Sequence, residues 1–203
     1  MKKNRISKNW INKQRRDIYV RRSKVDGYRS RAAYKLIEID EKFKIFKNGI
    51  SVIDLGAAPG SWSQYLSKNI KNSKIVSIDL QNMDEIDNIV QIKGDFTEEK
   101  NQYKIKDFFK SNVDVVLSDM AVNTTGNKKI DSIYTGELCM EAMAFSKNIL
   151  DKSGKFVSKI FMGSTFKEVV EEAKIIFKEV KIFKPKSSRK DSKESFIICK
   201  NLR

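Results

Sequence analysis

Residues 51–66 read SVIDLGAAPGSWSQYL, and this stretch decides the fold. Its first five residues, Ser51–Leu55, predict a buried strand, and the residues after Gly60 have the apolar spacing of a helix. Gly56 and Gly60 let the backbone approach a ligand at the helix N-terminus. The two glycines are four residues apart and Asp54 precedes them, so the motif is not GxGxxG. This spacing fits a cofactor built from methionine and adenosine better than a dinucleotide.

Short apolar runs alternate with amphipathic stretches on both sides of this motif, which predicts an α/β fold with a parallel sheet and helices on both faces. Strands are expected at 51–55, 74–80, 89–93, 113–118 and 155–161. Helices are expected at 30–46, 62–69, 104–111, 135–151 and 165–177. Two last strands, at 180–184 and 195–200, are separated by a short polar loop, so we expect them to enter the sheet as an antiparallel hairpin.

Positive charge is concentrated at the start of the chain. The 203 residues carry 41 Lys and Arg against 26 Asp and Glu, a formal charge of +15, and the first 35 residues hold 13 Lys and Arg against only Asp17 and Asp26. Clustered Lys and Arg release counterions when they neutralise phosphates, so we expect a polyanionic partner, either nucleic acid or an anionic membrane surface. We interpret residues 1–28 as a basic N-terminal arm that is ordered mainly on binding, and residues 29–203 as one domain.

The composition excludes several classes of chemistry. The chain has no His, which removes imidazole bases and imidazole metal ligands. Cys139 and Cys199 are 60 residues apart without a CxxC motif, so we expect reduced, buried thiols, no disulfide and no metal. No apolar run reaches the roughly 18 residues of a membrane helix, and no secretory signal is recognisable. We therefore expect a cytoplasmic protein without membrane contact and, because no coiled-coil heptads occur, a monomer.

Acidic residues follow successive strands of the expected parallel sheet. Asp79 lies 23 residues after Gly56, where Rossmann-like sites place a carboxylate on the ribose hydroxyls. Asp95, in the segment Gly94–Phe96, is suited to an adenine amino group. Either residue alone could equally be a helix cap or a turn residue. Carboxylates after neighbouring parallel strands meet at one sheet edge, so together with Asp54 they favour a ligand site.

Five segments share the pattern of a known family. They are DLGAAPGSWSQYL at 54–66, GDF at 94–96, SDMAVN at 118–123, GKFVSKIF at 154–161 and KSSRKDSKESFIICK at 186–200. Together they closely resemble the FtsJ-type ribosomal RNA 2′-O-methyltransferases, over Arg21 to Lys200. The resemblance implies a Rossmann-like methyltransferase fold that uses S-adenosyl-L-methionine, with a seven-stranded, mostly parallel sheet and an antiparallel C-terminal strand. The implied reaction is methyl transfer to the ribose 2′-hydroxyl of a uridine in large-subunit, 23S-type rRNA, in assembled ribosomal subunits.

The family uses a Lys-Asp-Lys-Glu tetrad, and its members match Lys35, Asp119, Lys159 and Glu194. A ribose 2′-hydroxyl is a weak acid, so its attack on a methyl group needs a base or a cation that stabilises the developing alkoxide. Because no His is available, we propose that Lys159 is the base, kept neutral often enough by partial burial and a second ammonium. Alternatively, Lys159 stays charged and only steers the hydroxyl. Lys35 and Asp119 would orient Lys159, and Glu194 would fix both lysines.

Further site residues are expected around the tetrad. By resemblance and position, the cofactor-binding residues are Asp54, Gly56, Ala57, Pro59, Gly60, Ser61, Trp62, Asp79, Leu80, Asp95, Phe96 and Asp119. The arm and the Lys-rich loop 184–193 are the natural phosphate contacts, with Arg21, Arg22, Arg29, Arg31, Lys186, Arg189 and Lys190 as the expected RNA-binding residues. Two positions depart from the family pattern, because Ser61 replaces a common third Gly and Val122 replaces the Pro of SDMAPN.

Competing functions are distinguished by what they require. Enzymes that methylate amino groups of bases typically carry Asn/Asp-Pro-Pro-aromatic after the fourth strand, and Ser118–Asn123 has neither prolines nor an aromatic residue. A cytosine C5 enzyme needs a reactive thiolate, whereas both cysteines are expected in the core. A tRNA 2′-O-methyltransferase would share the tetrad. A non-catalytic, RNA-binding ribosome assembly factor would need only the basic arm.

Overall fold

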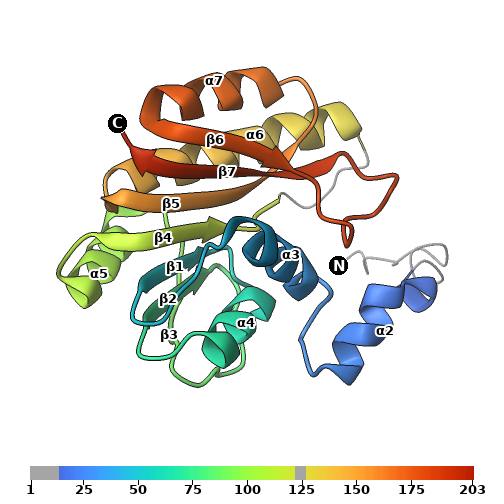
Figure 1. Ribbon diagram of the computed structural model, residues 1–203, viewed down its shortest axis with the longest axis horizontal. Coiled ribbons are helices and arrows are strands. Elements are labelled where there is room, and N and C mark those ends of the chain that lie inside the picture. The colour runs from blue at the N-terminus through green and yellow to red at the C-terminus, as the bar shows by residue number, and fades with distance from the viewer. Residues whose placement is uncertain (1–13, 122–126) are drawn as a thin grey trace, which may run out of the picture.

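A seven-stranded sheet runs through the molecule in the order β3-β2-β1-β4-β5-β7-β6 (Figure 1). The computed structural model describes residues 14–121 and 127–203. The strands are β1 Ser51–Leu55, β2 Lys74–Asp79, β3 Val90–Lys93, β4 Val113–Ser118, β5 Leu150–Phe161, β6 Phe177–Phe183 and β7 Glu194–Leu202. Strand β1 is parallel to β2 and β4, β2 is parallel to β3, and β4 is parallel to β5. The predicted fold class, α/β with a mostly parallel sheet, is confirmed.

The C-terminal hairpin enters the sheet in the antiparallel direction, as predicted. Strand β7 lies between β5 and β6 and is antiparallel to both. In this register Lys159 of β5 is opposite Phe196, and Phe161 is opposite Glu194. The first residue of β7 therefore lies at the sheet edge where β5 ends.

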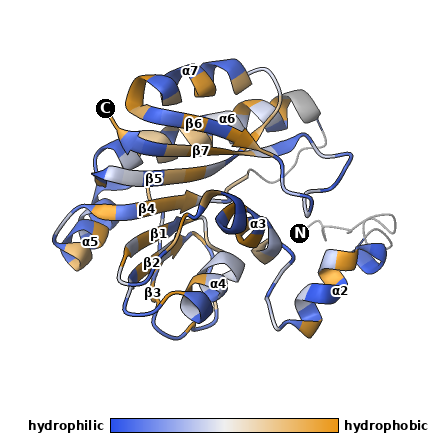
Figure 2. Cartoon of the chain, viewed as in Figure 1, coloured by the Kyte–Doolittle hydropathy of each residue, from blue (hydrophilic) through white to orange (hydrophobic). Residues whose placement is uncertain are grey.

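Helices cover both faces of the sheet and bury an apolar layer on each. They are α3 Ala33–Phe43, α4 Ser61–Asn69, α5 Glu99–Phe109, α6 Lys128–Lys147 and α7 Phe166–Ile176, whereas α2 Ile18–Val25 lies off the sheet. One layer contains Phe156 and Phe177, and the other contains Leu36 and Trp62. Figure 2 shows hydrophobic residues concentrated on the central strands β1, β2 and β4. None of the helices in the described ranges has the length and apolarity that a membrane span needs.

The expected helix bounds differ from the observed ones, most at the starts of α5 (Glu99 instead of 104) and α6 (Lys128 instead of 135), and two expected helices run into a strand. The helix expected at 135–151 ends at Lys147, and β5 begins at Leu150, which pairs with Val113 of β4. The helix expected at 165–177 ends at Ile176, because Phe177 pairs with Leu202 and begins β6. Apolar residues at these junctions continue the helical spacing, so periodicity alone cannot show that a neighbouring strand pairs with them.

The basic arm contains a helix that the sequence analysis did not predict. Helix α2 begins after Asp17, whose Oδ1 accepts hydrogen bonds from the backbone N–H groups of Tyr19 (3.1 Å) and Val20 (3.4 Å). The Tyr19 ring lies 5.4 Å from the ring of Tyr34 in α3, measured between centroids, so α2 packs on α3. Residues 1–13 of the predicted arm lie outside the described residues.

Candidate active site

The loop after β1 has the backbone that its glycines predict. Gly56 has φ 68° and Gly60 has φ 100°, both in the left-handed region that side chains rarely adopt. A Cβ at Gly56 would overlap the side chain of Met120, and one at Gly60 would lie 2.7 Å from Arg29 Nη1. Gly60 ends the loop immediately before α4. Neither position could take a side chain without displacing a neighbour.

A cavity of about 580 Å³ opens at the carboxyl ends of β1 to β4. Its lining includes the predicted cofactor residues Gly56, Asp79, Leu80, Asp95, Phe96 and Asp119. It also includes residues that the sequence analysis missed, which are Ala58, Ile78, Gln81, Gly94, Thr97, Met120, Ala121, Leu138 and Glu141. Most of these are chain neighbours of a predicted residue, and that adjacency is a usable signal. Leu138 and Glu141 come from α6, and only the tertiary structure brings them here.

A second, smaller cavity of about 30 Å³ lies on the other side of the loop. The predicted cofactor residues that line it are Asp54, Gly56, Ala57, Pro59, Ser61, Trp62 and Asp119. Of the predicted residues, Gly56 and Asp119 border both cavities, and Gly60 borders neither. Trp62 is buried, and its Nε1 donates to the Ala32 carbonyl at 2.9 Å. Ser61, one of the departures from the family pattern, lies with its Oγ 2.7 Å from Ser30 Oγ. Val122, the other departure, lies outside the described residues.

Asp79 and Asp95 hold their loops and also face the larger cavity. Asp79 accepts from the Ala58 N–H at 2.9 Å and from the Gln81 N–H at 2.8 Å. Asp95 Oδ1 accepts from the N–H of Thr97 at 2.9 Å and from its hydroxyl at 2.7 Å. The turn role and the ligand-facing position, weighed as alternatives from the sequence, occur in the same side chains.

Asp54 is a buried carboxyl beneath the glycine-rich loop. Ser63 Oγ donates to its Oδ2 at 2.7 Å and lies 2.5 Å from Ser77 Oγ. Burial, reinforced by the charges of Asp119 and Asp79, raises the pKa of Asp54 to about 7, although the Ser63 bond acts in the opposite direction. The carboxyl therefore titrates near neutral pH.

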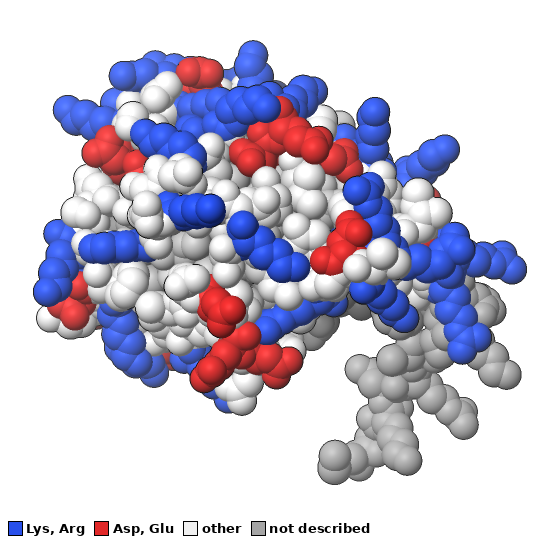
Figure 3. Space-filling model, turned by 60° about the horizontal axis from the view of Figure 1, so that its bottom comes forward, with Lys and Arg blue, Asp and Glu red and all other residues white. Residues whose placement is uncertain are grey.

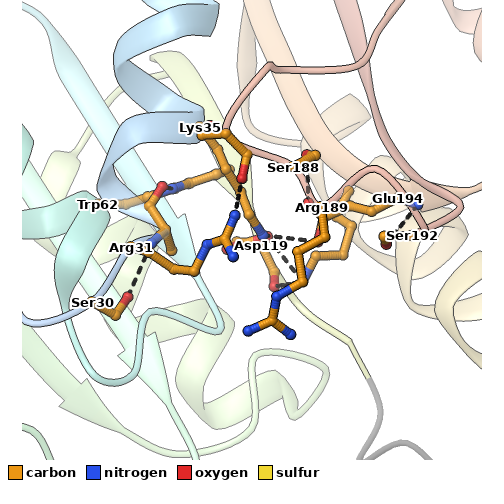
Figure 4. A network of polar contacts seen from close by, with 12 residues as sticks. Ser30, Arg31, Lys35, Trp62, Asp119, Ser188, Arg189, Ser192 and Glu194 are labelled. Atoms are coloured by element: carbon orange, nitrogen blue, oxygen red, sulfur yellow. Dashed lines mark hydrogen bonds and ion pairs between the residues drawn. The ribbon is translucent and has the colours of Figure 1, made fainter. Parts of the chain in front are cut away.

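Two lysines and two carboxylates meet beyond the end of β4 (Figure 4). Lys159 Nζ lies 2.9 Å from Asp119 Oδ1 and donates to the Asp119 carbonyl at 2.5 Å. Lys35 of α3 donates to Glu194 Oε2 at 2.8 Å and lies 3.6 Å from Asp119 Oδ1. Asp119 thus bridges both ammonium groups. The structure brings together all four predicted catalytic residues.

The charges in this cluster stabilise one another. Burial alone would lower the pKa of Lys35, but Asp119 and Glu194 outweigh it, so the pKa of Lys35 is raised. Burial alone would raise the pKa of Glu194, but Lys35 and Lys159 outweigh it, so the pKa of Glu194 is lowered. Lys35 and Glu194 are therefore both charged at neutral pH.

The Lys-rich loop that carries Glu194 into the site is anchored to the domain. Glu38 of α3 accepts from the backbone N–H groups of Lys186 (2.5 Å) and Ser187 (2.8 Å). Ser188 Oγ donates to Glu194 Oε1 at 2.7 Å, so each Glu194 oxygen has a partner. These bonds fix the position of the Glu194 carboxylate before any ligand is bound.

A groove of about 340 Å³ lies beside Lys35 and Glu194 of the tetrad, and its lining residues are Gln14, Arg31, Lys35, Arg189, Asp191, Ser192 and Glu194. Of the predicted RNA-binding residues, Arg31 and Arg189 line this groove. Arg22 and Lys186 line a separate surface hollow beside α2, and Arg21 and Lys190 are exposed. In Figure 3, Lys and Arg side chains gather at the end of the molecule that carries α2.

Arg29 has a different environment from the other predicted RNA-binding residues. Its Nη1 donates to the carbonyls of Pro59 and Asp84, both at 3.0 Å, and its Nη2 donates to the Glu85 carbonyl at 3.0 Å. The guanidinium thereby ties the glycine-rich loop to the loop that follows β2. Since these two loops border the larger cavity, Arg29 is placed to hold the cavity in shape.

The cysteines and the acidic residues offer little for other chemistry. Cys139 and Cys199 are buried, and burial raises the pKa of Cys139 to about 12 and that of Cys199 well above its usual value. Within 14–121 and 127–203, no three Cys, Asp or Glu side chains are grouped so that they could hold a metal ion. The thiols are thus core residues, as predicted.

The fold and the cavity at the carboxyl ends of its parallel strands are those of a Rossmann-like methyltransferase. The chain belongs to the FtsJ-like methyltransferase family, whose model matches residues 28–202, so the resemblance seen in the sequence is confirmed.

Similar proteins support this assignment. Over 203 residues, all of both chains, the protein is 75% identical to "Ribosomal RNA large subunit methyltransferase E" of Pelagibacter ubique strain HTCC1062. A relative of the same name from Rickettsia akari strain Hartford is 45% identical over 201 residues, 96% of this chain and 88% of the relative. A crystal structure of a candidate ribosomal RNA methyltransferase from Plasmodium falciparum matches with a TM-score of 0.77 and 35% identity, covering 86% of this chain and 98% of that one.

The role of Arg29 predicts a specific loss. Arg29→Lys keeps the charge but cannot reach three carbonyls, so S-adenosylmethionine, the cofactor that the resemblance implies, should bind about tenfold more weakly. Isothermal titration calorimetry measures the change. Arg15→Lys is the matched control, because Arg15 is exposed. Equal affinities for the two variants would contradict a role for Arg29 in shaping the cavity.

The buried carboxyl of Asp54 predicts a pH-dependent stability. Its pKa is raised from 3.8 to about 7 in the folded protein, so folding takes up a proton between these values and becomes less favourable as the pH rises through them. Asp54→Asn removes this effect while its amide oxygen still accepts from Ser63. The free energy of unfolding of Asp54→Asn relative to wild type should therefore rise from pH 5 to pH 8, as measured by urea denaturation without cofactor. A difference that stays constant over this range would refute the prediction.

Proposed function

We propose that this chain is an enzyme that transfers a methyl group from S-adenosylmethionine to the ribose 2′-hydroxyl of a uridine in large-subunit, 23S-type rRNA, in assembled ribosomal subunits. The observation that carries this proposal is the position of the tetrad between two openings. Asp119 borders the cavity at the strand ends, and Lys35 and Glu194 line the groove with the arginines. The name of the relative at 75% identity supports the choice of rRNA.

The larger cavity suits S-adenosylmethionine. The carboxylates of Asp79 and Asp95 face it as acceptors for ribose hydroxyls and an amino group, and the apolar side chains of Leu80 and Phe96 offer surfaces for an adenine ring. Gly56 lets the backbone approach the ligand closely. When bound, S-adenosylmethionine supplies a methyl group on a positively charged sulfur, and the hydroxyl oxygen takes that group.

Lys159 is the residue that we propose accepts the hydroxyl proton. Lys159 Nζ donates to the Asp119 backbone carbonyl at 2.5 Å and lies 2.9 Å from Asp119 Oδ1. A neutral lysine that donates to this carbonyl keeps its lone pair for the hydroxyl proton, and the Asp119 carboxylate lies beside the ammonium that forms when the proton is taken. Lys35, whose pKa is raised, stays an ammonium and balances the carboxylates.

The rest of the proposal concerns RNA. We propose that the arm, residues 1–28, and the loop 184–193 bind phosphates on both sides of the groove, with the arm ordered further by RNA. We expect the chain to act as a monomer, because helices already cover both faces of its sheet.

Replacement of Lys159 by alanine tests the proposed reaction. Lys159→Ala should reduce methyl transfer from labelled S-adenosylmethionine to hypomodified large ribosomal subunits by about a hundredfold or more, because the proton acceptor is lost. Lys152→Ala, which changes an exposed lysine of the same strand, is the control and should transfer at the wild-type rate. The label should resist alkali as a 2′-O-methyl dinucleotide.

Parallel substrates separate the alternatives. Label in bulk tRNA alone would keep the chemistry and overturn the rRNA substrate. Label in protein-free rRNA but not in subunits would overturn the assembled-particle claim. RNA binding without any label in any substrate would favour the non-catalytic assembly factor.

The pH dependence of the rate tests whether Lys159 acts as a neutral base. A neutral lysine base makes the rate at saturating substrate rise about tenfold per pH unit below the pKa of the base, and Lys159→Arg should be as inactive as Lys159→Ala because arginine does not lose its proton. Single-turnover rates from pH 6 to pH 9 measure both. A flat profile together with substantial activity in Lys159→Arg would show instead that a cation at this position suffices.

A further inference from the structure

Asp17 of the N-terminal arm contacts two arginines that line the groove beside the tetrad. While its Oδ1 caps α2, its Oδ2 forms ion pairs with Arg31 Nη1 and with Arg189 Nε, the latter at 3.4 Å. The Asp17 side chain is 9% exposed, against 15% for Arg31 and 29% for Arg189. One carboxylate from the start of the chain therefore joins an arginine before α3 to an arginine of the Lys-rich loop.

The two arginines are engaged differently. Arg31 uses Nη1 for Asp17 and Nη2 for the Ser187 carbonyl, so both of its terminal nitrogens are occupied. Arg189 uses only Nε, and its Nη1 and Nη2 have no hydrogen bond or ion pair to any residue in 14–121 or 127–203. In Figure 4 this end of Arg189 extends away from the network. Since Arg189 lines the groove with Lys35 and Glu194, a pair of parallel donors is presented next to the tetrad.

We propose that Arg189 binds a phosphate of the RNA through Nη1 and Nη2, and that Asp17 is the positioning residue that aims it. The proposal rests on the proposed function and names one contact within it. The ligand is a phosphodiester group adjacent to the methylated ribose, because the tetrad and Arg189 line one groove. Arg31, predicted from the sequence as a phosphate contact, instead joins Asp17 to the loop.

Charge supports a positioning role for Asp17. Burial and the nearby charge of Arg189 lower the pKa of Arg31, which shows that the two guanidinium groups repel each other. Asp17 lies against both and offsets that repulsion, while it is not among the residues that line the groove. The carboxylate therefore holds the arginines from behind and leaves the open side of Arg189 to a phosphate.

The decisive variant is Asp17→Asn. Asparagine caps a helix as well as aspartate does, so α2 is kept and only the charge is lost. A simple charge argument predicts tighter binding of RNA after loss of an acidic group, whereas the positioning role predicts weaker binding. Asp107→Asn makes the same change at an exposed position of α5, which lines none of the described cavities, and is the matched control.

Binding of protein-free large-subunit rRNA is measured by filter retention over a range of salt concentrations. We expect Arg189→Gln and Asp17→Asn each to weaken binding by about fivefold and to reduce the slope of log K against log salt by about one. Asp107→Asn should bind as tightly as wild type or slightly more tightly. The double variant should match Arg189→Gln, because Asp17 acts through Arg189.

Methyl transfer to ribosomal subunits separates this inference from the proposed function. The positioning role and the proposed function are both supported if wild type transfers the methyl group and Asp17→Asn raises KM while kcat stays within about twofold of wild type. Two outcomes, each with methyl transfer by wild type, overturn the positioning role alone. One is that Asp17→Asn binds RNA as tightly as wild type or more tightly, and the other is that the losses in the double variant are additive. The expected binding pattern without transfer by any protein overturns the proposed reaction alone.

Discussion

The shared carboxylate of Asp119 is the interaction on which the site depends. Its Oδ1 lies 2.9 Å from Lys159 Nζ and 3.6 Å from Lys35 Nζ, two side chains that are only 9% and 11% exposed, and a buried charge without a partner is strongly unfavourable. The residues that meet here come from α3, from the end of β4, from β5 and from β7. Strand pairing and the packing of α3 on the sheet bring the four side chains to one point, where each charge has an opposite charge beside it. The same carboxylate borders the cavity at the strand ends, so the charge cluster and this cavity share a wall.

The N-terminal arm and the loop 184–193 both contribute residues to the groove beside the tetrad. Lysine and serine dominate the loop 184–193, a composition typical of a solvated segment, yet Glu38 binds its backbone and Arg31 binds its Ser187 carbonyl. The arm is joined to the same loop through Asp17. Basic segments that are far apart in the sequence thus form one structured surface, where phosphate contacts can be placed at a fixed distance from Lys159.

Several carboxylates and one arginine have structural roles beside the predicted ones. Asp79 holds the glycine-rich loop through the Ala58 N–H while it faces the cavity. Arg29 donates hydrogen bonds to three backbone carbonyls, whereas the sequence analysis predicted a phosphate contact for it. Charged side chains at this edge of the sheet therefore preorganise the cavity as well as face it, which reduces the ordering that ligand binding would require.

The sequence by itself determined the α/β class and the glycine-rich loop, because periodicity and glycine spacing are local properties of the chain, and its resemblance to the FtsJ-type family gave the four residues of the predicted tetrad. It could not determine where α6 ends, since Leu150 is apolar in either structure and only its pairing with Val113 selects a strand. It could not show that α2 packs on α3 or that Arg29 and Arg189 differ, because both are arginines in basic segments. Those differences come from partners distant in the chain, the carbonyls of Pro59 and Glu85 for Arg29 and the carboxylate of Asp17 for Arg189, and only the tertiary structure brings such partners within bonding distance.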